Sequence, residues 1–232
     1  MTLKDDLSSD VRAIFRSAWD ERDGDKVPEP EDLGLGNDAV KLQATVLYAD
    51  LADSTLLVDN YTRKFAAEIY KTFLLCAARI IRGEGGVITA YDGDRIMAVY
   101  LGDWKNTNAA RTALKINWAV GNIINPAERA QYPNYPYDVK HVVGIDTSDV
   151  YVARTGIRRN NDLVWVGRAP NYAAKLATLP ENYATYITQA VYDIMKDGSK
   201  FAGDGTNMWT PLVWTEFDRS RIYGSTFWWE VT

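Results

Sequence analysis

The sequence has very little of what several common classes of protein need. A single cysteine, Cys76, and a single histidine, His141, occur in 232 residues, which excludes an intramolecular disulfide framework and a histidine-rich metal cluster. Acidic residues outnumber basic ones and give a net charge of −5, so no electrostatic surface for nucleic acid is expected. No apolar run is long enough to span a bilayer, and the N-terminus lacks an apolar signal core. These absences predict a cytoplasmic protein that binds neither membranes nor nucleic acid.

The chain divides into an N-terminal extension and one larger domain. Residues 1–40 predict a helix with an apolar stripe that begins near Ser8 and ends near Gly24, followed by an extended connector rich in acids and prolines. Residues 41–232 predict a single domain of strands and helices that ends in an aromatic hairpin. The apolar stripe could dock on this chain or on a partner subunit.

The hydrophobic patterns within the larger domain define its elements. They predict strands over 44–48, 139–145, 150–155, 163–166 and 185–187, helices over 62–82, 108–125, 168–179 and 189–195, a hairpin over 87–101, and a C-terminal hairpin after Pro211 that includes 227–229. Pro126 is expected to close the second of these helices. This order predicts an α+β fold of the ferredoxin-like group, with a mixed or antiparallel sheet and helices on one face.

Two aspartates stand at the ends of predicted strands. Asp50 follows a short apolar run, and Asp53 offers an N-cap for the helix that comes next. Asp92-Gly93 between two apolar arms is a strong hairpin signal, so Asp94 lies just past a turn. If the hairpin lies beside the first strand, both carboxylates reach one point and can hold two divalent cations for a phosphoryl displacement. Each acid taken alone is weak evidence for a metal site, because turns are rich in aspartate and Asp50 and Asp53 could merely cap a helix.

A third polar element lies on the predicted helix over 168–179. Asn171 and Lys175 are four residues apart and therefore share one helix face. An amide at this place could orient a sugar, and a cation could meet phosphate charge. The alternative is two ordinary surface side chains on a solvated helix.

Together these segments resemble the catalytic domain of the class III nucleotidyl cyclases. That family has a strand ending in Phe-x-Asp, a Gly-Asp hairpin, and a later Gly-x-x-Val-Asn-x-Ala-x-Arg helix. The corresponding segments are Tyr48-Ala-Asp50, Gly93-Asp94 and Gly167-Arg-Ala-Pro-Asn171-Tyr-Ala-Ala-Lys175, and Gly144-Ile-Asp-Thr-Ser-Asp-Val150 resembles the strand pair before that helix. The likeness extends over roughly residues 41 to 195 and implies a class III cyclase homology domain.

The resemblance implies a role for each matching residue. Asp50, Asp94 and the backbone carbonyl of Leu51 would bind two Mg²⁺ or Mn²⁺ ions. Asn171 would orient the ribose, and Lys175 would meet the charge that grows on the α-phosphate. Because the family builds each site from two subunits, a C2 homodimer with two composite sites is implied.

Several positions depart from the purine cyclases of the family. Ala90, four residues before the second metal aspartate, replaces a Lys or Glu that reads the base. Val164, three residues before the helix glycine, replaces an Asp, Thr or Cys. Tyr48 replaces a Phe near the base, and Lys175 replaces an Arg and keeps its charge without the bidentate fork. Arg95 is either a contact to uracil or a solvated charge of the hairpin.

These departures resemble the Pycsar pyrimidine cyclases of bacterial antiphage defence, which make cyclic UMP or cyclic CMP. The resemblance implies that UTP is converted to 3′,5′-cyclic UMP and pyrophosphate, and that a separate effector reads the product. Three alternatives stay open: a cytidylate cyclase, an adenylate cyclase with an unusual pocket, and an inactive cyclase-like dimerisation module. A diguanylate cyclase would show Gly-Gly-Asp/Glu-Glu-Phe at the hairpin, where this chain has Tyr91-Asp-Gly-Asp-Arg95.

Overall fold

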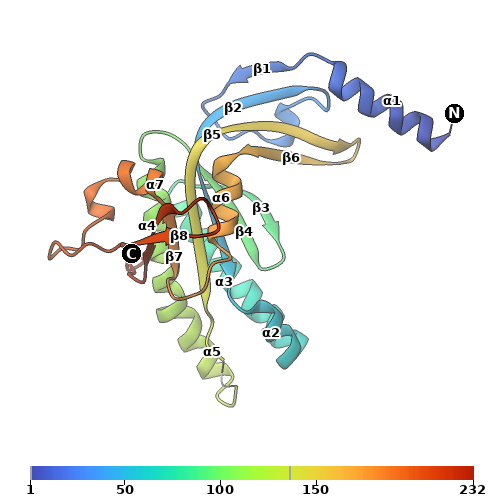
Figure 1. Ribbon diagram of the computed structural model, residues 1–232. Helices are drawn as coiled ribbons and strands as arrows, with labels where there is room; N and C mark the ends of the chain where they lie inside the picture. The colour runs from blue at the N-terminus through green and yellow to red at the C-terminus, as the bar shows by residue number, and fades with distance from the viewer. Residues whose placement is uncertain (1, 136) are drawn as a thin grey trace.

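The computed structural model describes residues 2–135 and 137–232, and within them nine strands form one mixed sheet (Figure 1). The order is β3-β4-β2-β5-β7-β9-β8, with β1 paired to β2 and β6 paired to β5. The strands are β1 (Asp20–Asp23), β2 (Asp38–Leu51), β3 (Val87–Asp92), β4 (Arg95–Tyr100), β5 (His141–Ile157), β6 (Asn160–Gly167), β7 (Thr185–Thr188), β8 (Thr210–Trp214) and β9 (Ser220–Ser225). The helices are α1 (Leu3–Arg16), α2 (Ser54–Asn60), α3 (Arg63–Gly83), α4 (Lys105–Ala119), α5 (Asn125–Gln131), α6 (Arg168–Leu176) and α7 (Gln189–Ile194). The predicted α+β class with a mixed sheet is confirmed.

Strands β2 and β5 form the centre of the sheet and pair in antiparallel register from Ala39↔Ala153 to Leu51↔His141. The prediction of two separate strands over 139–145 and 150–155 is wrong, because β5 runs unbroken through the polar segment between them. That segment stays extended because its residues pair with β2 and its side chains find partners on α6. Figure 1 shows β6, β1 and the adjoining halves of β2 and β5 extending beyond the helices as an arm.

The two faces of the sheet carry different helices. Leu47 and Ala49 of β2 face the larger core, which contains apolar side chains of α3, α4 and α7. Val46 of the same strand faces the opposite side and packs with Ala173 of α6. The expectation that all helices lie on one face therefore fails for α6. Close packing of α6 on β5 depends on Gly144, where a Cβ would lie 2.1 Å from the Ala173 carbonyl oxygen.

Two predicted helix boundaries need correction. Asp53 begins only the short α2, with φ of 56° and no side-chain cap, whereas α3 has its own N-cap in Thr62. Pro126 does not close the helix after residue 125, because a π-helical segment (Val120–Ile124) leads into α5, where the proline occupies the first turn. A proline is tolerated at that place because the first N–H groups of a helix lack intrahelical partners.

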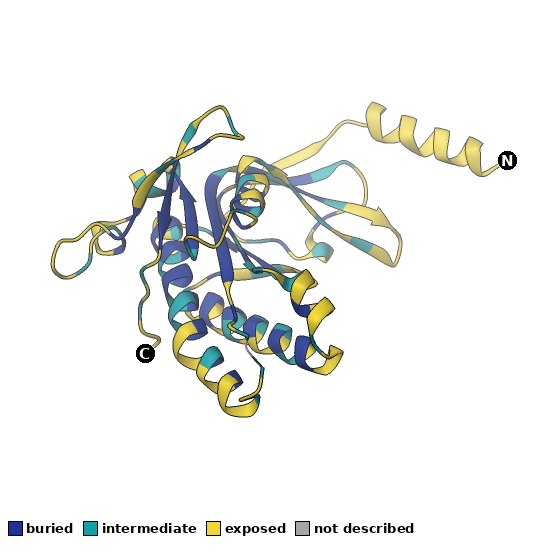
Figure 2. Cartoon of the chain, turned by 60° about the horizontal axis from the view of Figure 1, so that its bottom comes forward, coloured by how far each residue is buried: buried dark blue, intermediate teal, exposed yellow. Residues whose placement is uncertain are grey.

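The N-terminal extension also differs from its prediction. Helix α1 is capped by Thr2 rather than near Ser8 and ends at Arg16, and β1 then adds in parallel to β2. The sheet therefore begins before residue 41. None of the residues of α1 is buried, and Figure 2 shows the helix projecting away from the body of the molecule. None of the helices in the described part of the chain has the length and apolar character that a membrane span requires.

The C-terminal hairpin is formed by β8 and β9, and its bend contains Asp218 and Arg219, both at positive φ. The aromatic residues at 227–229, which were expected to belong to this hairpin, follow it as irregular chain. They lie along α4, where the Trp229 N–H donates to the Leu114 carbonyl at 3.1 Å. The hairpin therefore ends the sheet, and the last residues cover a helix.

Candidate active site

The hairpin of β3 and β4 places Asp94 at the end of β2 that carries Asp50. Gly93 and Asp94 form the two-residue turn, with Gly93 at φ of 63°. Strand β4 pairs with β2 through Ile96↔Ala49, so the tip of the hairpin lies beside Asp50. The two carboxylates interact electrostatically, and the structure therefore brings together the two acids that the sequence singled out.

Burial dominates the electrostatics of Asp50. It raises the pKa of this carboxyl to about 6, against the opposing charge of Arg95 and with a further upward contribution from Asp94. The Arg95 Nε donates a hydrogen bond to Asp50 Oδ2 at 3.1 Å. The alternative in which Arg95 is a solvated hairpin charge is therefore wrong, since its side chain is only 31% exposed and is paired inside the site.

The two acids have the chemistry of a divalent-cation site. Asp94 Oδ2 is buried and has no hydrogen-bond partner among the described residues, so an oxygen that strongly needs a donor or a cation lies beside a second carboxylate. Mg²⁺ and Mn²⁺ take oxygen ligands of this kind. Among the described residues no group of three or more acidic, histidine or cysteine side chains is poised around an ion. Backbone carbonyls and substrate oxygens would have to complete the shell, and the role of the Leu51 carbonyl stays a prediction.

Tyr48 and Ala90 lie in one row across three strands. Tyr48 of β2 pairs with Met97 of β4, which pairs in turn with Ala90 of β3. Paired residues point to the same face of a sheet, as do residues two apart on a strand, so Tyr48 shares its face with Asp50. Burial raises the pKa of the Tyr48 hydroxyl, and the nearby charge of Arg95 opposes that shift. Tyr48 therefore lies within the electrostatic reach of the acidic site.

Val164 lies at the other end of the sheet. It pairs with Ala153 of β5, which pairs with Ala39 at the start of β2. Eleven residues (50 − 39) separate Ala39 from Asp50, which corresponds to roughly 36 Å of strand. The two predicted base-reading positions, Ala90 and Val164, are therefore not brought together within one chain.

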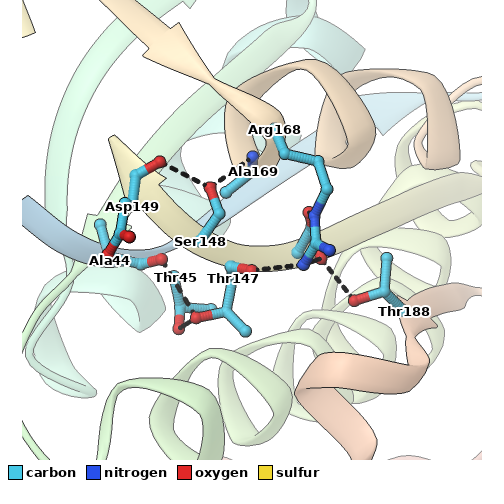
Figure 3. A network of polar contacts seen from close by, with 9 residues as sticks. Ala44, Thr45, Thr147, Ser148, Asp149, Arg168, Ala169 and Thr188 are labelled. Atoms are coloured by element: carbon cyan, nitrogen blue, oxygen red, sulfur yellow. Dashed lines mark hydrogen bonds and ion pairs between the residues drawn. The ribbon is translucent and has the colours of Figure 1, made fainter. Parts of the chain in front are cut away.

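An ion pair between the buried Asp146 and Arg168, whose side chain is 46% exposed, anchors the first residue of α6, and Figure 3 shows Arg168 reaching Thr147 at this place. The Arg168 guanidinium donates to both carboxylate oxygens of Asp146 on β5, at 2.9 and 3.2 Å, and to the Thr147 carbonyl at 2.7 Å. Thr188 donates to the same carboxylate at 2.5 Å. The helix has no side-chain cap of its own, and its Ala169 N–H instead donates to a serine hydroxyl of β5.

Sequence reasoning missed this anchor. Asp146 is fully buried in the middle of a strand, and Arg168 is the first residue of the helix that carries Asn171. A buried charge needs a partner of opposite sign. The signal was therefore an aspartate within an apolar strand pattern, together with an arginine at the start of a helix that packs on that strand.

Asn171 and Lys175 project from the exposed side of α6, in one stripe with Arg168. The Lys175 Nζ lies 4.0 Å from the centroid of the Phe217 ring, a cation–π contact. Among the described residues neither side chain forms a hydrogen bond or ion pair with Asp50 or Asp94. One chain thus presents an acidic hairpin region and a separate polar helix region.

Comparison with known proteins identifies the family to which the chain belongs. The chain is 51% identical to a uridylate cyclase of Xanthomonas perforans, over 100% of both chains. It is 40% identical to a uridylate cyclase of Rhodovulum sp. (strain MB263), over 98% of both. The chain belongs to the uridylate cyclase family. The prediction of a nucleotidyl cyclase is thereby confirmed, although no family model matches the sequence.

Solved structures support the same fold for this member of the uridylate cyclase family. The guanylyl cyclase Cya2 matches with a TM-score of 0.68 at 16% identity, over 82% of this chain and 94% of that one. The adenylyl cyclase CyaB from P. aeruginosa matches with a TM-score of 0.63 at 19% identity, over 81% and 95%. At these identities the likeness concerns the fold, which is the class III cyclase fold that the motifs predicted.

Proposed function

We propose that this family member converts UTP to 3′,5′-cyclic UMP and pyrophosphate. The observation that carries the proposal is full-length identity of 51% to a protein named uridylate cyclase. The acidic pair and the polar helix supply the groups that such a reaction needs. The remaining arguments concern how these groups act and which base they select.

In this proposal Asp50, Asp94 and the Leu51 carbonyl hold two Mg²⁺ or Mn²⁺ ions. Bound there, the cations would neutralise triphosphate charge and favour attack by the 3′-oxygen on the α-phosphorus. Asn171 orients the ribose through its amide. Lys175 meets the negative charge that grows on the α-phosphate, and for that role its ammonium must leave the Phe217 ring.

We propose that each active site is completed by a second copy of the chain. Within one chain, Val164 is separated from the acidic end of β2 by roughly 36 Å of strand. Tyr48 and Ala90 lie at that acidic end. A C2 homodimer can set the arm end of one subunit against the hairpin end of the other, twice, and so form two equal sites.

The base choice follows from which groups line the pocket. Ala90 and Val164 have no side-chain group that can pair with a purine edge, and a purine would leave its polar atoms unsatisfied there. The Tyr48 ring shortens the space beside Asp50, and its hydroxyl can bond a pyrimidine. CTP is the second candidate because it differs from UTP only at one ring position. An adenylate cyclase or an inactive module is disfavoured by the same residues and by the retained acid pair.

The wider setting is part of the same proposal. Residues 41–232 carry every residue of the proposed site and form its catalytic domain, whereas residues 1–40 supply α1, β1 and the first residues of β2. The protein acts in the cytoplasm as a second-messenger synthase of antiphage defence. A separate effector with a cyclic-nucleotide sensor reads the product.

A competition assay tests the proposal. The purified protein is incubated with equal concentrations of UTP, CTP, ATP and GTP and with Mn²⁺, and the products are identified by mass spectrometry. Cyclic UMP is expected to dominate, followed by cyclic CMP. Dominant cyclic AMP would overturn the pyrimidine assignment, and dominant cyclic CMP would overturn the choice of uracil alone.

A further inference from the structure

Arg95 is held against Asp50 by the register of the sheet. It is the first residue of β4, directly before Ile96, which pairs with Ala49 of β2. Arg95 therefore lies across from Asp50, and its Nε donates to Asp50 Oδ2 at 3.1 Å. The Asp50 side chain is 14% exposed, so the pair is partly withdrawn from water.

This ion pair leaves the acidic cluster incompletely satisfied. The Asp50 carboxylate lies within electrostatic reach of two further carboxylates, those of Asp94 and Asp92, and of the single Arg95 guanidinium. Arg95 contacts only Asp50 among them, and the buried Asp94 Oδ2 keeps no partner. A divalent cation carries twice the charge and can take oxygens from two carboxylates at once. The guanidinium is therefore a weaker ligand for this cluster than such a cation.

Arg95 is also close to Tyr48, the residue that we propose contacts the base of the nucleotide. Its charge is felt by the Tyr48 hydroxyl, which shares the sheet face of Asp50. Among the described contacts, Arg95 uses only its Nε, so the two terminal nitrogens of the guanidinium remain available. That planar fork suits the carbonyl oxygens of a pyrimidine or the oxygens of a phosphate.

We infer that Arg95 and the divalent cation compete for Asp50, and that cation binding frees the guanidinium to contact the nucleotide. The inference rests on the proposed function, because it assigns the acid pair to a cation. In the cation-free protein, Arg95 takes the place of the cation as the partner of Asp50. Cation and nucleotide binding are then coupled through one side chain, since the ion that takes Asp50 also releases a nucleotide contact.

The ion pair can be observed directly in the nucleotide-free protein. The Nε–H resonances of ¹⁵N-arginine are recorded by NMR while Mg²⁺ is added, and Arg95 is assigned from its loss in Arg95→Lys. We expect its resonance to shift or to exchange faster as Mg²⁺ binds. Arg168, whose Nε donates to Asp146 at 2.9 Å, is the matched internal control and should not change. An unchanged Arg95 resonance at saturating Mg²⁺ would overturn the inference.

Binding of Mn²⁺ gives a second, independent measurement. Free Mn²⁺ is followed by electron paramagnetic resonance for the wild type and for Arg95→Gln, both without nucleotide. Removal of the competing group should tighten Mn²⁺ binding about threefold to tenfold. Arg79→Gln removes the same charge from the exposed side of α3 and should leave the affinity unchanged. Equal or weaker binding by Arg95→Gln would overturn the inference.

These outcomes are separate from the test of the proposed function. If the four-nucleotide assay yields no cyclic UMP while Arg95 still responds to Mg²⁺, the competition stands and the substrate assignment fails. If cyclic UMP forms but Arg95 stays bound to Asp50 in Mg²⁺, the cyclase assignment stands and the competition fails.

Discussion

Two arginine–aspartate pairs, one in each half of the proposed site, use the same groups in different ways. Asp146 is fully buried, accepts two bonds from Arg168 and a third from Thr188, and so leaves no charge without a partner. Asp50 accepts a single bond from Arg95, and the neighbouring Asp94 keeps an orphaned oxygen. The carboxylate of the Arg168–Asp146 pair is fully hydrogen-bonded without a ligand. The carboxylates around the Arg95–Asp50 pair are not.

The difference separates structural from ligand-binding charges. A pair whose buried carboxylate is fully hydrogen-bonded holds one element on another, and here it fixes the start of α6 on β5. An unsatisfied cluster costs folding free energy that a ligand can recover. We therefore expect the Arg168–Asp146 pair to control stability and the Arg95–Asp50 pair to control chemistry. The following predictions test that division.

The largest effect should come from the acidic half. Asp94→Asn and Asp50→Asn should each lower turnover on the order of 10³-fold or more, since each removes a cation ligand. The melting temperature should change little, because neither acid is fully satisfied in the native protein. Turnover is measured at saturating Mn²⁺ and stability in a chelator. Near-normal turnover in either variant would contradict the two-cation assignment.

On the helix half, Lys175→Ala should lower kcat by about 10²- to 10³-fold and change KM for UTP little, because the contact strengthens only in the transition state. Lys175→Arg restores the charge and should recover most of kcat. Steady-state kinetics with UTP provide the measurement. A variant with raised KM and intact kcat would remove Lys175 from its assigned role.

The anchoring pair should dominate stability. Asp146→Ala should lower the free energy of unfolding by about 2 to 4 kcal/mol, somewhat less than for a fully buried pair because Arg168 keeps access to water. Asp50→Ala should lower the free energy of unfolding by about 1 kcal/mol or less, because the single hydrogen bond from Arg95 offsets little more than the cost of burying the carboxylate. Urea unfolding of both variants in a chelator measures the contrast. Equal losses would show that the two pairs do not differ as described.

A smaller effect is expected at the base pocket. Tyr48→Phe removes one hydroxyl and should lower kcat/KM for UTP by about twofold to tenfold, the usual range for one hydrogen bond. Thermal stability should stay close to that of the wild type because the ring is retained. If kcat/KM and the ratio of UTP to ATP turnover are both unchanged, Tyr48 is not a base contact.

Sequence reasoning succeeded where the signal was local. The Asp92-Gly93 pattern placed Asp94 at a hairpin tip, and the apolar run before Asp50 placed that acid at a strand end. Their closeness needed only the pairing of β4 with β2. The site residues beyond this geometry, including Asn171, stay predictions because their partners belong to a second subunit in the proposal.

The failures concern partners that are distant in the sequence. The polar segment of β5 reads as a turn because the arginine that neutralises Asp146 lies 22 residues further on. The pairing of Arg95 with Asp50 depends on strand register across 45 residues. Composition and periodicity do not encode such register, so both ion pairs were missed: for Arg95 the sequence suggested only a contact to uracil or a solvated charge.

The most direct test of the account is whether the two halves of the site come from different subunits. Asp94→Asn and Asn171→Ala proteins, each inactive alone, are mixed and allowed to exchange subunits, and cyclic UMP formation is measured. Half of the dimers would be mixed and each would contain one intact site, so about one quarter of wild-type activity should return. Absence of any recovery after verified exchange would contradict the composite site.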